Sequence, residues 1–219
     1  IGVIHMLNNE QNNDIMQNFD IKQVLAAFAK KGYKTAHFAD GAAAAAYLNE
    51  QIDGCTVSFG DSRTLYNMGV YDLLAKHNQV IDPMHPEPGQ NFFEVLPLTT
   101  KGEIFLTSVN AATINGELVN IDAIGNRVAG TLYGHGKVYF VFSISKLCTD
   151  LEHAIWRARN VAAPQNTSRK GYRTPCAVKG DKCYDCQSPD RICNALVIHL
   201  HCLKRAEAEI VLIDEKLGF

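Results

Sequence analysis

Helical and strand patterns alternate along residues 20–82, and this alternation constrains the fold more than any other feature of the chain. The helical segments show apolar residues at helical spacing, as in Val24, Leu25 and Phe28, and the strand segments are short β-prone runs. The predicted helices cover 20–32, 40–52 and 62–77, and the predicted strands cover 34–39, 55–60 and 79–82. Strands that alternate with helices favour a parallel sheet with helices on its faces. We therefore predict an α/β fold with a mainly parallel sheet flanked by helices.

The middle of the chain breaks this alternation. Four prolines within residues 83–101 predict an irregular excursion over the surface. A strand is expected at 103–109. The dipeptide Asn115-Gly116, which lies between two β-prone runs, then predicts a type I′ hairpin.

The remaining segments complete one domain. A short helix is predicted over 125–134, a buried strand over 137–143, and a final strand over 209–219. The segment 149–152 has the form of a capping box, and the apolar stripe of the helix that it opens stops before Pro164. The chain is therefore divided into an N-terminal arm at 1–19 and a single domain at 20–219, with a cysteine-rich insertion at about 168–195 before the last strand.

Composition and charge exclude several classes of protein. The 219 residues are 47% hydrophobic and 20% charged, which is ordinary for a globular protein and excludes a largely disordered one. The net charge of −2 gives no electrostatic support for nucleic acid as a partner. The longest apolar runs are too short to cross a bilayer, so membrane insertion is not expected. Seven cysteines without a signal segment predict a reducing, cytoplasmic location.

Four of the cysteines lie in one short run, TPCAVKGDKCYDCQSPDRIC, with the spacing C-x6-C-x2-C-x6-C. Thiolates are the soft ligands that hold zinc or iron–sulfur clusters, and four of them complete either kind of site. We predict a shared metal site; the alternatives are free or redox-active thiols and, last, two structural disulfides. The predicted ligands are Cys176, Cys183, Cys186 and Cys193.

The segment FGDSRTL at 59–65 joins a predicted buried strand to a helix. Ser62, Thr64 and the free N–H groups of the helix start have the composition of an anion cradle, and Arg63 adds charge. An ordinary N-cap by Ser62 or the preceding aspartate explains the same residues without a ligand. Neither a G-x-G-x-x-G pattern nor a P-loop is present, so no motif supports a dinucleotide or a triphosphate.

A second polar region, NAATINGELVNIDAIGNRVAG at 110–130, surrounds the predicted hairpin and its exit into a helix. So many amide and carboxylate side chains favour a polar pocket over core packing. Arg127 has two interpretations. It forms a structural clamp to Asp122, or it binds a carboxylate or phosphate through two hydrogen bonds.

We expect both regions to face one cleft at the carboxyl ends of the sheet strands, where strands end and helices begin. Arg127 is the predicted charged anchor, and Asn110 and Asn126 are predicted to orient the ligand. Lys146 adds a second positive charge or is a solvated surface lysine. The predicted anion-binding residues are Gly60, Ser62, Arg63, Thr64, Asn110, Asp122, Gly125, Asn126, Arg127 and Lys146.

Several segments together are similar to a known family. GDSRTLYNMGVYDLL, TSVNAATINGELVNIDAIGNRVAG, DLEHAIWRARNVAAPQN and the cysteine run resemble the lactate-utilisation (LUD) domain family, in the branch with a C-terminal cysteine motif, over about residues 20–219. The resemblance implies a fold similar to the NagB/RpiA/CoA-transferase-like group, which formyltetrahydrofolate cyclo-ligases also use. It also implies cytoplasmic lactate or organic-acid metabolism beside iron–sulfur and flavin oxidoreductase components. One departure is the segment 61–63, where relatives often show a smaller Gly-Ser-type turn.

Three functions are compatible with these observations. In the first, the protein is a component of a redox system that binds a small carboxylate or phosphate-bearing ligand and an iron–sulfur cluster, beside other redox subunits. In the second, it is an accessory or regulatory binding module with a structural zinc ion. In the third, it is a transferase-like or ligase-like enzyme, by fold analogy. An iron–sulfur cluster is preferred over zinc because the family context is redox and the run lacks the paired C-x2-C hooks common in structural zinc sites.

Overall fold

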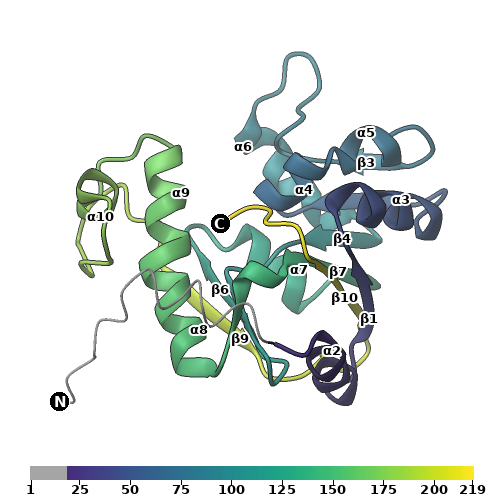
Figure 1. The fold of residues 1–219 in the computed structure, drawn as a ribbon. Coiled ribbons are helices and arrows are strands. Elements are labelled where there is room, and N and C mark those ends of the chain that lie inside the picture. The colour runs from purple at the N-terminus through teal and green to yellow at the C-terminus, as the bar shows by residue number, and fades with distance from the viewer. Residues whose placement is uncertain (1–18) are drawn as a thin grey trace.

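The large sheet of the domain is parallel throughout (Figure 1). The structure is a computed structural model that describes residues 19–219, so residues 1–18 of the predicted N-terminal arm lie outside the described residues. Six strands pair in the order β1-β10-β7-β4-β2-β3. They are β1 (Lys34–Phe38), β2 (Thr56–Phe59), β3 (Gln79–Ile81), β4 (Ile104–Thr107), β7 (Lys137–Ser143) and β10 (Glu207–Ile213). The predicted α/β fold class is confirmed.

A second, smaller sheet was not predicted. Its strands pair in the order β8-β5-β6-β9, and β6 is antiparallel to both of its neighbours. They are β5 (Ala111–Thr113), β6 (Leu118–Asp122), β8 (Leu147–Cys148) and β9 (Ala195–His199). The cysteine run is therefore followed by β9 of this sheet, and the last strand of the chain, β10, comes only after that.

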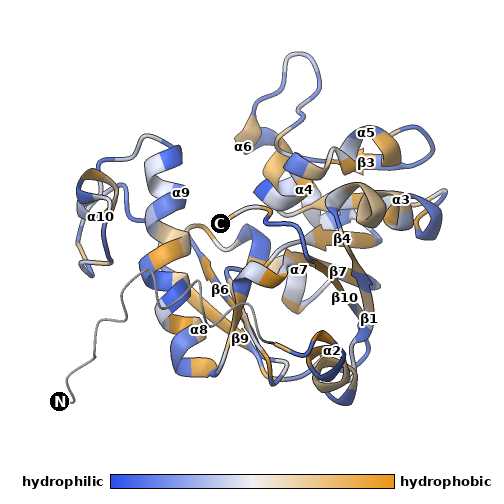
Figure 2. Cartoon of the chain, viewed as in Figure 1, coloured by the Kyte–Doolittle hydropathy of each residue, from blue (hydrophilic) through white to orange (hydrophobic). Residues whose placement is uncertain are grey.

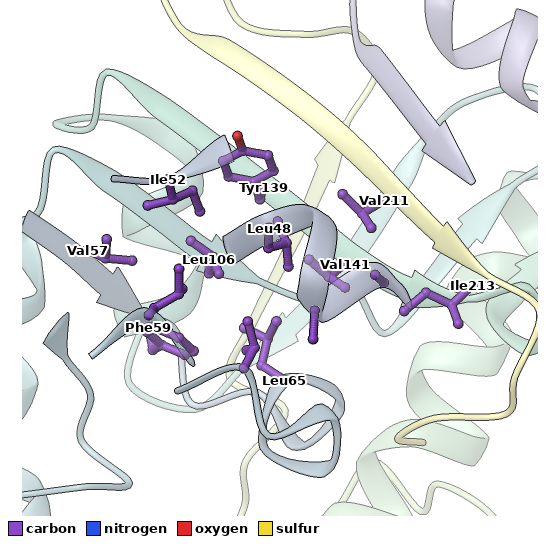
Figure 3. Packing of buried hydrophobic residues seen from close by; sticks show 14 of the residues in the cluster. Leu48, Ile52, Val57, Phe59, Leu65, Leu106, Tyr139, Val141, Val211 and Ile213 are labelled. Atoms are coloured by element: carbon purple, nitrogen blue, oxygen red, sulfur yellow. The ribbon is translucent and has the colours of Figure 1, made fainter. Parts of the chain in front are cut away.

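Both faces of the large sheet are buried, because successive side chains along a strand point to opposite faces. On one face, α3 (Gly41–Gln51), α4 (Arg63–Met68) and α5 (Val70–Leu74) pack against residues such as Leu106 and Val141 (Figure 3). On the other face lie α2 (Ile21–Lys30) and the β5–β6 hairpin, which pack against the alternate residues of the same strands. Accordingly, the strands of this sheet are mainly hydrophobic in Figure 2.

The last long helix continues through Pro164, where the sequence predicted that it stops. It runs from α8 (Leu151–Arg157) through a π-helical stretch (Ala158–Ala162) into α9 (Ala163–Arg169). Proline lacks an N–H group, and the wider π turn before it lets the helix resume with Pro164 in the first turn of α9. The helix start also differs from the predicted capping box, because Asp150 is the N-cap and accepts a hydrogen bond from the His153 N–H at 2.8 Å.

Two further local predictions were wrong. The helix predicted over 62–77 breaks at Gly69, which adopts a left-handed conformation with φ of 65°. The Asn115-Gly116 turn is not of type I′: Gly116 alone has positive φ, and Thr113 and Glu117 close a three-residue loop with a 2.9 Å hydrogen bond. A type I turn followed by a left-handed glycine explains this geometry.

The remaining helices are short. The proline-rich excursion contains α6 (Phe92–Val95) and a 3-10 helix (Leu96–Lys101), and α7 (Asn126–Leu132) follows β6. A 3-10 turn (Ile144–Lys146) follows β7, and α10 (Pro175–Lys179) lies inside the cysteine run. Within residues 19–219, no helix has the length and apolar character needed to span a membrane.

Candidate functional site

The chain reverses its winding between two neighbouring strands of the large sheet. From β2 it continues to β3 on one side, whereas from β4 it continues to β7 and then to β10 on the other. The carboxyl ends of β2 and β4 therefore flank a topological switch point, where open α/β sheets bind their ligands. The segments that follow these two strands, 61–64 and 108–110, border a cavity of about 330 Å³.

Three other parts of the chain close this cavity. One part consists of residues 121–124, 126 and 127, from the end of β6 to the start of α7. The second is Lys146, which follows β7, and the third is α9, which contributes Asn166 and Arg169. Gly218 and Phe219 also line the cavity, and Figure 1 shows the C-terminal end of the described chain between α9 and α4. The cavity is thus built by segments that lie far apart in the sequence.

The lining of the cavity is rich in positive charge. Two of its cations are paired: Lys170 Nζ lies 3.4 Å from Asp61 Oδ2, and Arg127 Nε lies 3.5 Å from Asp122 Oδ2. The other cations have no carboxylate partner among residues 19–219, and this surplus favours an anionic ligand. Five basic side chains line the cavity with these two carboxylates: Arg63, Arg127, Lys146, Arg169 and Lys170.

Lys146 is the most deeply buried of these basic residues, with 3% of its surface exposed. Its Nζ lies 3.1 Å from both Ser108 Oγ and the Val109 carbonyl oxygen, and 3.2 Å from Thr64 Oγ1. Burial, reinforced by two nearby arginines, holds the pKa of Lys146 well below its usual range. The prediction of a solvated surface lysine is therefore wrong for this residue.

Comparison with known proteins places this architecture in a family. A model of the LUD domain matches residues 21–213. The chain belongs to the LUD domain family. Membership of this family makes it a lactate-utilisation-related protein, as the resemblance implied.

One solved structure shows the same LUD-type fold. The crystal structure of a DUF162 family protein from Deinococcus radiodurans is 11% identical in sequence, with a TM-score of 0.52, over 92% of this chain and 98% of that one. At this identity the likeness concerns the fold alone. No curated protein matches the chain.

Most of the predicted anion-site residues of this LUD domain line the cavity: Ser62, Arg63, Thr64, Asn110, Asp122, Asn126, Arg127 and Lys146. Gly60 and Gly125 are outside the lining. A Cβ atom on Gly60 would lie 2.9 Å from the Phe105 ring, so this glycine lets β2 and β4 approach each other. Gly125 is the N-cap of α7 and has φ of 91°, a conformation that glycine adopts readily. Binding by any of these residues stays a prediction.

The turn before α4 combines capping with a strained backbone. The Leu65 N–H donates to Ser62 Oγ at 3.3 Å, so Ser62 is the N-cap of this helix, as the simpler interpretation expected. Asp61 has φ of 48°, which non-glycine residues rarely adopt. Such outliers concentrate at functional sites.

The polar segment after β6 is organised around Asp122, which is almost fully buried. Its carboxylate accepts hydrogen bonds from the N–H groups of Gly125, Arg127 and Val128 at 3.1–3.3 Å. The guanidinium of Arg127 also donates to the Ile121 carbonyl oxygen. Arg127 is thus a structural clamp in this structure, and its role as a ligand anchor stays a prediction.

The cavity residues that sequence reasoning missed include Ser108, Arg169 and Lys170. The two cations come from the end of α9 and the position after it, a hydrophilic stretch in Figure 2. Because the helix was predicted to stop before Pro164, neither cation was expected at the cavity. Ser108 directly follows β4, and its position after a buried strand was the signal that could have found it.

The four clustered cysteines are half-buried, and all seven cysteines of the chain are free in the structure. Arg191 donates to the carbonyl oxygens of Cys186 at 2.6 Å and Cys193 at 3.1 Å. The Cys183 N–H donates to Asn160 of the π-helical stretch at 3.0 Å. The segment is therefore held by its backbone against the long helix.

Three thiols of this segment, those of Cys183, Cys186 and Cys193, influence one another without forming a closed site. Burial raises the pKa of Cys193, and the neighbouring Cys183 and Cys186 thiols add to this, while Arg191 opposes it. Within residues 19–219, no group of three or more His, Cys, Asp or Glu side chains is arranged to hold a metal ion. Convergence of the four sulfurs on one ion stays a prediction.

Proposed function

We propose that this LUD domain binds a small organic acid, or a small phosphate-bearing anion, at the carboxyl edge of its parallel sheet, as a component of a redox system in lactate utilisation. The observation that carries the proposal is the surplus of cations in the switch-point cavity. Arg63 and Arg169 line it without a carboxylate partner among the described residues, in addition to the paired Arg127 and Lys170. A bound anion supplies the missing countercharge, and its carboxylate or phosphate oxygens accept charge-assisted hydrogen bonds.

The position of the cavity supports the same function. Its floor consists of the segments that directly follow β2 and β4, so binding groups are held by the rigid sheet. Asn110 Oδ1 accepts from the Ile121 N–H at 2.7 Å, which fixes the orientation of this amide beside the cavity. The volume of about 330 Å³ suits a small ligand.

Thermal unfolding with candidate ligands tests the proposal. L-lactate, pyruvate, glycolate and inorganic phosphate are compared at equal ionic strength. A ligand present at about 100 times its dissociation constant stabilises the fold by about 2.7 kcal/mol, which raises the melting temperature by several degrees. Titration calorimetry then gives the affinity. A chain that none of these anions stabilises contradicts the proposal.

Substitutions separate cavity binding from general charge effects. Arg63→Ala and Arg169→Ala each remove one unpaired cavity cation, and we expect about tenfold or greater loss of affinity from each. Lys34→Ala is the control. Lys34 lies at the amino end of β1, whereas the cavity lies at the carboxyl ends of the strands, and it pairs with Glu207 at 3.0 Å. The control should leave affinity unchanged. Equal losses in all three variants point to non-specific electrostatics.

Metal analysis and thermal unfolding distinguish two alternatives. As an accessory or regulatory module, the protein would carry one structural zinc ion in place of an iron–sulfur cluster. As a transferase-like or ligase-like enzyme, it would be stabilised by acyl-CoA or nucleotide ligands, which are expected to have no effect under the proposed function.

We also propose that Cys176, Cys183, Cys186 and Cys193 bind an iron–sulfur cluster, with zinc as the alternative. Support comes from the chemistry of four clustered thiols and from Arg191, which brings the backbone of Cys186 and Cys193 to one guanidinium. Since the described arrangement is not a closed site, metal binding is expected to reorganise this segment locally.

Metal analysis of protein purified without oxygen tests this second proposal. Iron, acid-labile sulfide and visible absorption support the cluster, and one colourless zinc ion per chain supports the structural alternative. Replacing Cys183 and Cys186 together by serine should abolish either signal, whereas Cys55→Ser, outside the run, should not. Protein without bound metal contradicts both forms of the proposal.

A further inference from the structure

The environment of Lys146 suits a neutral amine better than an ammonium ion. A neutral amine has two N–H donors and one lone pair. Its three oxygen neighbours could also accept from an ammonium, but they satisfy the neutral amine in full: Nζ can donate to the Val109 carbonyl and to one hydroxyl, and accept an O–H from the other, with Ser108 and Thr64 as the two hydroxyls. Among residues 19–219 no carboxylate pairs with it, so the buried ammonium form has no countercharge in this part of the chain.

The backbone also covers the Lys146 amine on one side, while the residue lines the ligand cavity. A Cβ atom on Gly218 would lie 3.2 Å from Lys146 Nζ and 2.5 Å from Thr64 Oγ1, so the backbone near the C-terminal end packs directly over this group. The residue nevertheless lines the cavity, as do both hydroxyl neighbours. A buried amine that keeps its lone pair and faces a ligand cavity is a nucleophile for carbonyl carbon.

We propose that Lys146 forms an imine with the carbonyl carbon of a small 2-oxo acid whose carboxylate is held by the cavity cations. This inference rests on the proposed function, because it needs an anion in the same cavity. It adds the substrate class: a carbonyl group for the amine, and next to it a carboxylate for Arg63 or Arg169.

The step balances without an external oxidant or reductant. The Nζ lone pair attacks the carbonyl carbon, and the electrons of the C=O π bond move to oxygen, which takes up a proton. The nitrogen loses a proton to give a carbinolamine. Its hydroxyl group then takes up a second proton and leaves as water while the nitrogen lone pair forms the C=N bond, and loss of the remaining N–H proton from the iminium gives the imine. Ser108 and Thr64, both in contact with Nζ and 3.3 Å from each other, are placed to relay these protons.

Reductive trapping on the intact chain tests the proposal. Pyruvate is added as the smallest 2-oxo acid, borohydride reduces any imine to a stable secondary amine, and peptide mapping by mass spectrometry locates the adduct. The expected adduct has the mass of pyruvate less one oxygen atom and lies on Lys146. Lys170 is the internal control, because it lines the same cavity but pairs with Asp61. We expect labelling of Lys146 to exceed that of Lys170 severalfold, because Lys170 Nζ is held in an ion pair with a carboxylate and Lys146 Nζ is not.

Further arms of the experiment make each outcome decisive. Excess L-lactate, which has no carbonyl group at C2, should compete and suppress the adduct. Ser108→Ala should slow trapping severalfold while pyruvate binding by calorimetry is kept. Lys146→Met should abolish the adduct, and if that variant does not fold, the mapping of the wild-type chain decides alone. Pyruvate binding with no adduct on Lys146, or equal labelling of Lys170, overturns the imine and leaves the proposed function intact. Failure of both acids to bind overturns the proposed function as well.

Discussion

The carboxylate of Asp122 holds Arg127 at two points, its backbone N–H at 3.1 Å and its Nε at 3.5 Å. The carboxylate is almost fully buried, so the arginine also supplies its countercharge. This geometry makes the start of α7 dependent on one side-chain pair.

Arg127→Ala should therefore lower stability before it affects any ligand. Removing the guanidinium leaves Asp122 buried with backbone donors alone, and we expect a loss of about 1–3 kcal/mol in the free energy of unfolding. For a domain of this size that is about 2–4 °C in melting temperature for each kcal/mol. Urea and thermal unfolding measure it.

Arg169→Ala is the control for this variant. Its side chain is exposed and donates to Asn166 at 2.9 Å, so its removal should change stability by no more than about 0.5 kcal/mol. An Arg127→Ala protein with unchanged stability but lost anion affinity would show that Arg127 is a ligand anchor rather than a clamp.

Gly130 tests how tightly α7 packs on the sheet. A Cβ atom there would lie 2.5 Å from the Phe105 ring, and this ring is held from another side by His135, which stacks on it at 4.8 Å. Alanine is better than glycine in a helix by about 1 kcal/mol, but overpacking a rigid core costs about 1–3 kcal/mol, so the clash should win. We expect Gly130→Ala to be destabilising in urea unfolding.

Gly136→Ala serves as the matched control for Gly130→Ala. At Gly136 a new Cβ atom would meet its nearest neighbour at an ordinary 3.6 Å. Its stability should stay within about 0.5 kcal/mol of the wild type. Equal effects at the two glycines would mean that α7 can shift away from the sheet.

The location of the site could be predicted from the sequence because the strand ends and helix starts that form it have local sequence patterns. The strand ending at Phe59 and the capping serine after it are both visible as patterns, and strand order then brings them to the end of β4. The parallel sheet brings the carboxyl ends of β2, β4 and β7 to the same side. This explains why Thr64 and Lys146 are in contact although neither sequence segment predicts contact with the other.

What could not be predicted depends on long-range geometry. The helix continues past Pro164 only because a π turn precedes it, and no propensity scale carries that information. The second sheet joins β6 to β9 across more than seventy residues, so its pairing has no local signal. The burial of Lys146 follows from the packing of Gly218 against it, which likewise comes from the far end of the chain.

Arg191 should control the order of the cysteine segment. It donates to Cys186 and Cys193 and pairs with Asp185 at 2.9 Å, so Arg191→Ala removes three contacts at once. We expect faster amide exchange across residues 183–193, while global unfolding changes little because the segment packs at the surface of the domain. Hydrogen–deuterium exchange read by mass spectrometry measures both regions.

Arg173→Ala is the comparison within the same segment. The Arg173 side chain forms no hydrogen bond or ion pair with residues 19–219; its backbone N–H donates to Asp190 at 2.9 Å, and the substitution keeps that bond. Exchange in the Arg173→Ala protein should match the wild type. Protection that persists in the Arg191→Ala protein would show that the helix contacts at Asn160 and Arg159 suffice to order the segment.

Stability should fall on mild acidification because of two buried histidines. Burial lowers the pKa of His135, opposed by the Gly102 carbonyl, and burial likewise lowers the pKa of His199, opposed by the Thr131 carbonyl. With a folded pKa below the unfolded value of about 6.5, the unfolded chain binds more protons between the two values. The contribution of the two neutral histidines to the free energy of unfolding is therefore fully present above pH 6.5. It is lost as the pH falls through their pKa values in the folded protein.

Urea unfolding at pH 7.5 and pH 5.0 measures this loss as a difference between two conditions. His135→Gln and His199→Gln should each reduce the difference, and together they should remove more of it than either does alone. The readout is the pH difference within each variant, so a change in stability common to both conditions does not affect it. Asp82 works in the opposite direction, because burial raises the pKa of this carboxyl despite hydrogen bonds from Met84 and His85, and its contribution grows on acidification. A double variant that keeps the full acid-induced loss would place the responsible protons on other groups.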